Sequence, residues 1–583
     1  MNKMLYKRIF SLFLILILSL GCIGCHRQVS PQNQQSEFDT FLEELFIQKV
    51  QSDSLSLNYS LARPERYGIT MAEATFGEFS AKSMNREQAL LENQLSRLLS
   101  YNYPSLSEDQ QLTYDILKDY LQNDLALGDY NYYYECLGPT TGIQAQLPIL
   151  LAEYGFYDKD DIDEYLRLLP RVYDYFEEII RFQREKSKAG LFMSDAVAKQ
   201  VIAQGEAFIT DAENNFLITC FNDRVSGYSN LSQEEISSYQ AANTEIVLSS
   251  VIPAYQMLVD ALRELLGTGT NNAGLFYYPE GRDYYACLAR RKTGSGKSME
   301  EMTTLLEAAM AKGVRDITSL TLSDPDILGK YIAFRSYPIT APEEILLDLK
   351  ADSQEDFPVA PEVNCRIKYV PDSLADYLSP AMYLVPPMDN YRNNDIYING
   401  SDEETLSLIY PTVAHEGYPG HMYQCVYFRS LNPAPIRNVM NFTGYDEGWA
   451  TYVEMYSYKY AGIDPNLARF LQANNAVILC LYARTDIGIH YEGWNKKTAM
   501  AYIMNYIADA KIAGAIYDTL LEEPAVYLPY AVGYLELEEL RGKAEHTLGK
   551  KFVAKDFHQF LLEIGPAPFE IIEDRMVSWM KSR

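Results

Sequence analysis

Apolar residues recur every three or four positions along most of this chain, which is the spacing of one face of an amphipathic helix. Near the N-terminus, Phe38, Phe41 and Leu45 share one such face. Ser298 is followed three residues later by Glu301, a pairing typical of the capping box that begins a helix. The same apolar spacing predicts helices over 37–50, 84–99, 108–121, 162–184, 194–212, 232–266 and 298–311.

The pattern changes near Pro358. Three short β-rich runs, 366–370, 381–385 and 395–399, predict strands of a small sheet. A helix is expected over 403–415, and helical spacing then continues to the C-terminus. We therefore predict a mainly α protein in two parts. A large helical N-terminal lobe covers 37–357, and an α+β lobe with a small sheet and a long helical C-terminal part covers 358–583.

The first residues have the pattern of an export signal. Lys3, Lys7 and Arg8 precede an apolar run over 9–20, which is too short to span a bilayer comfortably. Two cysteines, Cys22 and Cys25, then each follow a glycine, as at the lipidation site of a bacterial lipoprotein. The alternative is an ordinary signal peptide that contains cysteines.

We predict a lipoprotein signal peptide with its lipobox over 1–25 and a polar tether over 26–36. No later segment is predicted to span a membrane. The mature protein would then be exported and lipid-anchored through Cys22 or Cys25, on the outer face of the bacterial cytoplasmic membrane or facing the periplasm.

The charge balance excludes one class of partner. Asp and Glu number 79 against 50 Lys and Arg, for a formal net charge of −29. Such acidity opposes binding to nucleic-acid phosphates, so no nucleic-acid partner is expected. The six cysteines beyond the N-terminal region are scattered without a CxxC pair, which argues against a zinc ribbon or a thiol-redox motif. Nothing in the sequence indicates an oligomeric state.

Two of the six histidines lie in one heptapeptide, HEGYPGH, as His415 and His421. Two imidazoles that hold zinc, with the adjacent Glu416 as general base on zinc-bound water, are typical of zinc peptidases. A straight helix would place a residue six positions on about 240° around its axis, which is the wrong face for chelation. A break at Pro419-Gly420 would bring the two rings together. The alternative is that His421 packs structurally and another residue ligates the metal.

A third protein ligand is expected at Glu447, in the run DEGWA that lies 26 residues after His421. The Asn-Glu-Gly-Phe-Ala motif of the gluzincins, a branch of zinc peptidases, is similar to this run. Glu454 follows Glu447 by seven residues and returns to nearly the same helix face. It is expected to orient a histidine ligand or to serve as an alternative ligand.

With these motifs, the chain resembles a bacterial lipoprotein family catalogued as domain of unknown function 885, which is allied to the gluzincin-type peptidases. The resemblance covers most of the mature chain, including the helix-rich part 162–204. One departure is Met422, where the family has a further histidine, so His421 becomes the sole candidate there. The matching motifs are HEGYPGHMYQ (415–424), EGWATYVE (447–454), RTDIGIHYEGW (484–494), Leu540-Arg541 and Phe557-His558.

The resemblance implies a mostly helical, metal-dependent hydrolase with a deep cleft, and a zincin-like catalytic lobe. It also implies possible roles for three more residues. His490 would hydrogen-bond the tetrahedral intermediate, ligate zinc in place of His421, or be a satisfied core histidine. Tyr530 would stabilise the oxyanion of peptide hydrolysis or be structural. Arg541 would bind a substrate carboxylate or form a structural salt bridge.

The predicted function is zinc-dependent hydrolysis of peptide bonds by a membrane-anchored enzyme. Glu416, His490 and Tyr530 are the predicted catalytic residues, and His415, His421 and Glu447 the predicted zinc ligands. By analogy with zincins, the strand 395–399 would receive an extended peptide by main-chain pairing. Two alternatives remain open: a zinc hydrolase of a non-peptide amide or ester, and a lipid-anchored binding protein without turnover.

Overall fold

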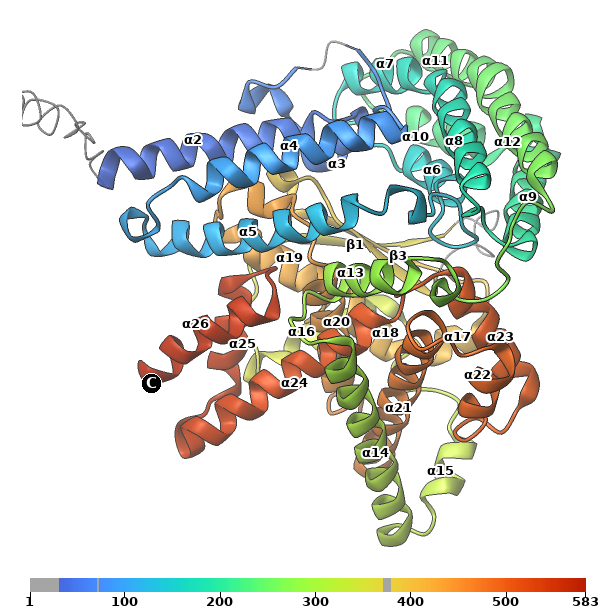
Figure 1. Ribbon diagram of the computed structural model, residues 1–583. Coiled ribbons are helices and arrows are strands. Elements are labelled where there is room, and N and C mark those ends of the chain that lie inside the picture. Colours follow the sequence, from blue (N-terminus) through green and yellow to red (C-terminus); the bar gives the residue numbers. More distant parts are fainter. Residues whose placement is uncertain (1–30, 71–72, 371–378) are drawn as a thin grey trace, which may run out of the picture.

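The computed structural model describes residues 31–70, 73–370 and 379–583. Over these ranges the chain is mainly helical with one three-stranded sheet, which confirms the mainly α prediction (Figure 1). The predicted signal peptide, Cys22, Cys25 and the tether up to residue 30 lie outside the described residues. The rest of the predicted tether, residues 31–36, is helical, because helix α2 begins at Pro31 and runs to Val50. Proline suits the first turn of a helix, and the following glutamines are good helix formers.

Two hydrophobic cores divide the molecule. The buried residues of one all lie between 136 and 265, and its helices lie at the upper right of Figure 1. The other unites the helices before residue 129 with nearly everything after residue 280. The helices of the smaller core are α6 (Ile143–Ala152), α7 (Lys159–Leu168), α8 (Arg171–Lys188), α9 (Asp195–Thr210), α10 (Phe216–Ser226), α11 (Gln233–Ile246) and α12 (Ile252–Leu265).

This division differs from the predicted boundary near residue 357. Helix α5 packs on the C-terminal part of the chain: the rings of Tyr120 and Phe442 lie 5.8 Å apart, and Arg575 pairs with Asp115 at 2.7 Å. The predicted lobe 37–357 is therefore not one unit. The larger core begins with α2 and with α3 (Ser54–Ser60), α4 (Ala81–Leu99) and α5 (Glu108–Gly128), and continues with α13 (Gly281–Thr293), α14 (Met299–Ser323), α15 (Ile327–Ala333) and α16 (Pro342–Asp352).

Proline divides two of the predicted helices. The run 162–184 is broken between α7 and α8, where Pro170 is the N-cap residue of α8. The run 403–415 is broken into α17 (Glu403–Ser407) and α18 (Tyr410–Glu416), with Pro411 in the first turn of α18. In both cases proline lacks the N–H that a continuous helix needs. The predicted helix 232–266 is present as one continuous helical segment, Gln233–Leu265, although it contains Pro253.

The segment Gln233–Leu265 is long and apolar enough to cross a membrane, judged by length and composition. It consists of α11, a π-helical turn at Val247–Val251, and α12. Its buried residues, among them Tyr255 and Leu258, belong to the smaller core, where α12 packs against α8 and α9. The apolar character of this segment is thus explained by packing inside the protein.

The sheet has the order β1-β3-β2. Strand β1 (Asn364–Tyr369) runs parallel to β3 (Asn393–Ile398), and β2 (Ala381–Leu384) runs antiparallel to it. All three predicted strands are present, but the strand predicted to receive substrate is the central one. Because both edges of β3 are already paired, the analogy with a substrate-binding edge strand is wrong for β3. Among these strands, β2 has the free edge that borders the cavity described below.

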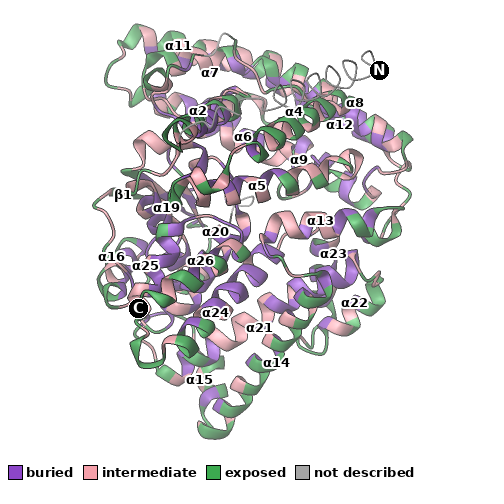
Figure 2. Ribbon diagram, turned by 60° about the vertical axis from the view of Figure 1, so that its left-hand side comes forward, coloured by how far each residue is buried: buried purple, intermediate pink, exposed green. Residues whose placement is uncertain are grey.

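The C-terminal helices complete the larger core. Helices α20 and α24 are largely buried and lie at the centre of the view in Figure 2. The C-terminal helices are α19 (His421–Ser430), α20 (Thr443–Ser457), α21 (Pro465–His490), α22 (Lys496–Ile503), α23 (Ala510–Glu522), α24 (Leu528–Leu548), α25 (Ala554–Ile564) and α26 (Phe569–Lys581).

Candidate metal centre

The break between α18 and α19 brings His415 and His421 together. Helix α18 ends directly after His415-Glu416, and α19 begins at His421. In between, a Cβ on Gly420 would lie 1.8 Å from the carbonyl oxygen of His415, so only glycine fits this close approach. The two imidazole rings lie 4.8 Å apart and are nearly perpendicular. The helix break predicted from Pro419-Gly420 is thus present.

The turn is held from α20. Trp449 is fully buried, and its indole Nε1–H donates a hydrogen bond of 2.9 Å to the carbonyl oxygen of Pro419. A helix break leaves backbone carbonyls without intrahelical partners, and here a side chain supplies one. The same helix therefore carries both the support of the turn and the third member of the cluster.

That third member is Glu447. Its Oε2 lies 3.3 Å from His421 Nε2 and 3.5 Å from His415 Nε2. Candidate ligand atoms of the three residues all lie within 4.8 Å of one another. The carboxylate oxygen is buried and has no partner in hydrogen-bonding geometry among the described residues. An orphaned carboxylate oxygen that faces two imidazole nitrogens fits a metal with nitrogen and oxygen ligands.

The other nitrogen of His415 is oriented by Glu454. Its Nδ1 lies 3.0 Å from the Glu454 carboxylate, which is carried two turns further along α20 than Glu447. A carboxylate on Nδ1 selects the tautomer in which Nε2 is free to bind a metal. Of the two predicted roles of Glu454, the structure thus places it in the orienting one.

The charges of this cluster are strongly coupled. Burial opposes a proton on His415, but its contacts with the Glu447 and Glu454 carboxylates outweigh burial and raise its pKa well above the usual value. Burial likewise opposes a charge on Glu447, and the two imidazoles outweigh it and lower its pKa. Burial raises the pKa of the neighbouring Asp446 to about 7. Metal binding requires imidazole nitrogens and a carboxylate without protons, so a bound cation would displace any proton that the cluster carries.

Glu416 lies beside the cluster without joining it. Its Oε2 accepts a hydrogen bond of 2.8 Å from the backbone N–H of Tyr383 on the free edge of β2. Glu416, His415, His421 and Glu447 line one cavity of about 420 Å³. The predicted general base and the three predicted ligands therefore share one site.

Tyr530 also lines this cavity, near the start of α24. Its ring is stacked on that of His415 at 6.3 Å. Burial, with added effects of Glu447 and Glu416, raises its pKa, so the phenol keeps its proton at neutral pH.

Glycines set the position of Tyr530. A Cβ on Gly533 would lie 2.1 Å from the carbonyl oxygen of Gly444, and one on Gly448 would lie 2.6 Å from the backbone of Gly533. These glycines let α20 and α24 approach closely, which places Tyr530 one turn from the crossing.

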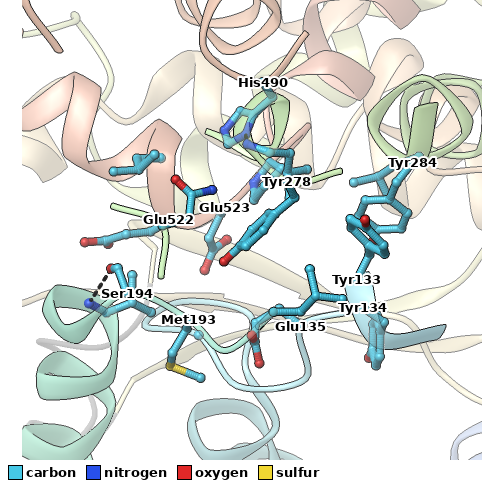
Figure 3. A pocket seen from close by; sticks show the side chains of 18 of the residues that line it. Tyr133, Tyr134, Glu135, Met193, Ser194, Tyr278, Tyr284, His490, Glu522 and Glu523 are labelled. Carbon is cyan, nitrogen blue, oxygen red and sulfur yellow. Dashed lines mark hydrogen bonds between the residues drawn. The ribbon is translucent and has the colours of Figure 1, made fainter. Parts of the chain in front are cut away.

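His490 lies elsewhere. Its Nδ1 accepts a hydrogen bond from the N–H of Leu275 at 3.1 Å, and its Nε2 donates to the carbonyl oxygen of Leu520 at 2.8 Å. The ring is fully buried and stacks on Tyr285. It borders a separate cavity of about 240 Å³, where Figure 3 shows it across from Glu522 and Glu523. The prediction that His490 acts at the metal site is thus corrected: both ring nitrogens are occupied, and burial lowers its pKa to about 4.

Arg541 is also placed outside the cavity, and it bonds to Glu545 and to the hydroxyl of Tyr452. Residues that the sequence argument missed line the cavity instead: Tyr383, Arg429, Arg437 and Asn438. The arginines have no periodic pattern around them that would have marked them. The glycines 444 and 448 stand four residues apart on one helix face, and that spacing was an available signal of a close helix crossing.

With this geometry established, the sequence can be compared with known proteins. The family model described as "Bacterial protein of unknown function (DUF885)" matches residues 64–576. The chain belongs to the DUF885 family. No match is found among curated proteins.

Two solved structures share the fold of this DUF885 protein. A candidate lipoprotein from Colwellia psychrerythraea superposes with a TM-score of 0.83 at 17% identity, covering 95% of this chain and 100% of its own. A candidate lipoprotein of unknown function from Shewanella oneidensis superposes with a TM-score of 0.62 at 16% identity, covering 92% of this chain and 99% of its own. At such identities the likeness shows a common fold.

Proposed function

We propose that this DUF885 protein is an exported, lipid-anchored zinc peptidase that hydrolyses peptide bonds in the cavity between β2, α18 and α20. The observation that carries the proposal is the set of His415, His421 and Glu447, with Glu416 beside it on the cavity wall. Two histidines and one glutamate are the protein ligands of one class of catalytic zinc site, which keeps a position open. The same donor set is found in the gluzincins, which supports the proposed likeness to them.

The metal preference follows from the donors. Two imidazole nitrogens and one carboxylate suit zinc better than magnesium or calcium, which favour oxygen ligands. When bound, zinc supplies a Lewis acid and a concentrated positive charge next to the scissile carbonyl. Glu454, through its contact with His415 Nδ1, keeps that ligand in the correct orientation.

The remaining chemistry belongs to the residues of the chain. Glu416 accepts the proton of the attacking water and returns it to the leaving amine. Its carboxylate is held for this role by the N–H of Tyr383. Tyr530, protonated and buried against His415, donates a hydrogen bond to the oxyanion that forms on the carbonyl oxygen. The free edge of β2 offers main-chain groups to an extended peptide.

The proposed anchor rests on two observations. The sequence has a charged, then apolar, then Gly-Cys pattern over its first 25 residues. Both solved structures with this fold are named as candidate lipoproteins. Export through a signal peptide followed by lipidation at Cys22 or Cys25 accounts for both. Replacing both cysteines by Ser should release the protein from membranes, which fractionation of cells would measure.

The decisive test measures metal and turnover on the same samples of the mature chain. We expect about one zinc ion per chain and cleavage of peptides in a random library, with cleavage lost on chelation and restored by zinc. Glu416→Gln should keep the zinc and lose about 10²- to 10⁴-fold in turnover. The control His546→Gln changes an exposed histidine outside the cavity and should change neither value.

Two results would contradict the proposal in different ways. Zinc binding with cleavage of esters or non-peptide amides, but of no peptide, would indicate a different substrate class. A correctly folded chain that binds no zinc, and whose residual hydrolysis is the same in Glu416→Gln, would indicate a binding protein without turnover.

A further inference from the structure

One cation in the wall of the metal-site cavity has no anionic partner. Arg437 belongs to the short 3-10 turn Pro435–Asn438, and its side chain is 5% exposed. Among the described residues, no Asp or Glu lies within 4.0 Å of its guanidinium. Burial lowers the pKa of Arg437 to about 10, so it remains charged at neutral pH. A buried charge without a counter-charge is costly, so its presence in a cavity wall requires an explanation.

The hydrogen bonds of Arg437 leave part of the guanidinium available. Its Nη2 donates to the carbonyl oxygens of Ile564 at 2.7 Å and Pro566 at 3.1 Å. These two bonds fix the plane of the group. The Nε is enclosed and has no partner, and Nη1, which is not enclosed in this way, makes no hydrogen bond with the described residues. A rigid guanidinium with a free donor is well suited to a carboxylate.

The rest of the wall strengthens the attraction for an anion. Arg429 lines the same cavity, donates to the carbonyl oxygen of Pro386, and has no carboxylate partner among the described residues. The acidic residues of the wall are Glu416, Asp446 and Glu447. Neither arginine is paired with one of these carboxylates, so both guanidinium charges attract an anionic group of a ligand in the cavity.

We propose that Arg437 is a substrate-binding residue for a carboxylate, so that the peptides cleaved carry either a free C-terminal carboxylate or an acidic side chain near the scissile bond. This inference rests on the proposed peptidase function and adds the substrate class. A cavity of about 420 Å³ encloses only a short segment of peptide, which places the recognised carboxylate within a few residues of the metal.

Arg541 provides the comparison within the same chain. Its guanidinium bonds to Glu545 and to the Tyr452 hydroxyl, and it does not line the metal-site cavity. Its charge is therefore balanced inside the protein, whereas that of Arg437 is not. Loss of either arginine removes one positive charge and some packing, but only Arg437 is expected to change which peptides are cleaved.

The test uses three random hexapeptide libraries with the zinc-loaded mature protein. The first has free C-termini and no Asp or Glu, the second is C-terminally amidated and also lacks Asp and Glu, and the third is amidated but contains Asp and Glu. A charge-assisted contact predicts that the first or the third is cleaved about 10- to 100-fold faster than the second. Preference for the first assigns a C-terminal carboxylate, and preference for the third assigns an acidic side chain. Equal cleavage of all three would overturn the carboxylate subsite while leaving the peptidase intact, and cleavage of none would overturn the peptidase and the subsite with it.

Variants connect the preference to the residue. Arg437→Gln should reduce the ratio between the preferred library and the second one towards unity, by raising KM for the preferred peptides, and Arg437→Lys should restore part of it. Arg541→Gln should leave the ratio unchanged. If Arg437→Gln merely disturbs folding, all three rates fall together and the ratio persists, which would assign Arg437 a structural role and refute the proposal.

Discussion

His415 and His490 are both buried near the C-terminal end of a helix, yet their ring nitrogens have opposite surroundings. At His490, one nitrogen accepts from a backbone N–H and the other donates to a backbone carbonyl, so the neutral ring is fully satisfied. At His415, one nitrogen meets the carboxylate of Glu454 and the other faces the orphaned oxygen of Glu447. Backbone partners use up the donor capacity of a ring, whereas carboxylates around a free nitrogen prepare it for a cation.

The carboxylates of the two cavities differ in the same way. In the wall beside His490, Glu523 accepts from the N–H groups of Thr140 and Thr141, and Glu135 pairs with Lys186, although Lys292 in the same wall has no carboxylate partner among the described residues. The wall beside His415 includes an unpartnered carboxylate oxygen and an unpaired arginine. Unsatisfied buried polar groups are rare in native proteins and tend to mark sites that bind ligands. The following experiments test whether this contrast divides function from structure.

The largest effect is expected for zinc content. His421→Ala removes one of three protein ligands, so zinc should fall from about one ion per chain to nearly none after dialysis. His490→Ala should retain its zinc, because neither ring nitrogen faces the cluster. Elemental analysis of both dialysed variants measures this. Equal loss of zinc in the two would erase the contrast between the two histidines.

The next largest effect is on the free energy of unfolding, and here the variant at His490 is the affected one. His490→Ala should lower the free energy of unfolding by about 4 kcal/mol, because it opens a cavity and strands a buried N–H and a buried carbonyl. Denaturant titration measures this loss, which should be the same with and without zinc. His546→Ala, at an exposed position, should stay within about 0.5 kcal/mol of the parent. A loss that disappears on adding zinc would instead couple His490 to the metal.

A smaller effect is expected for the residue that orients His415. Glu454→Gln keeps the shape of the side chain and removes its charge, so the affinity for zinc should weaken about 10- to 100-fold. Competition with a chelator of known affinity measures this change. The matched variant Glu522→Gln, in the wall of the other cavity, should leave zinc affinity unchanged. If Glu454→Gln left the affinity for zinc unchanged, the inference that this carboxylate orients His415 would be wrong.

The smallest effect concerns pH and the surroundings of His490. Asp486 is fully buried beside it, and burial raises the pKa of this carboxyl to about 8. Between the unfolded pKa of about 4 and this value, only the folded state holds the proton, so stability falls as pH rises. His490 has the opposite sign, with a folded pKa of about 4 below the unfolded one, and its stabilising contribution increases up to about pH 6.5.

Above about pH 6.5, therefore, only the contribution of Asp486 to stability still changes with pH. The parent should lose about 2 kcal/mol relative to Asp486→Asn between about pH 6.5 and pH 8. Unfolding free energies measured for both proteins at several pH values give the difference, in which other titrating groups cancel. A flat difference would show that Asp486 is already ionised in the folded protein.

Much of the local structure could be predicted from the sequence alone. Three helices before residue 130, α2, α4 and α5, follow from apolar spacing. The capping box at Ser298 forms as expected, with Ser298 Oγ and the Glu301 carboxylate each accepting from the backbone N–H of the other. The three strands are also present where the composition placed them. Such features depend on contacts between residues a few positions apart, and these are written directly in the order of the residues.

The candidate site could be predicted only in part from such local patterns. His415, Glu416, His421 and Glu447 come together because two short motifs specify them and Gly420 permits the turn between the histidines. The function of His490 could not be decided, although it belongs to an equally specific motif. Its two hydrogen-bond partners stand 215 and 30 residues away, and no local pattern shows where they lie.

By itself, then, the sequence determined the helices, the strands, the motif residues of the metal centre and the acidic character of the chain. Only the tertiary structure decided that α2 to α5 share a core with the C-terminal helices, that β2 rather than β3 has the free edge, and that Arg437 lies unpaired in the cavity wall. The physical reason is the range of the interactions. Periodicity and capping act within one turn or strand, whereas the partner of a buried charge or ring is chosen by packing between distant segments.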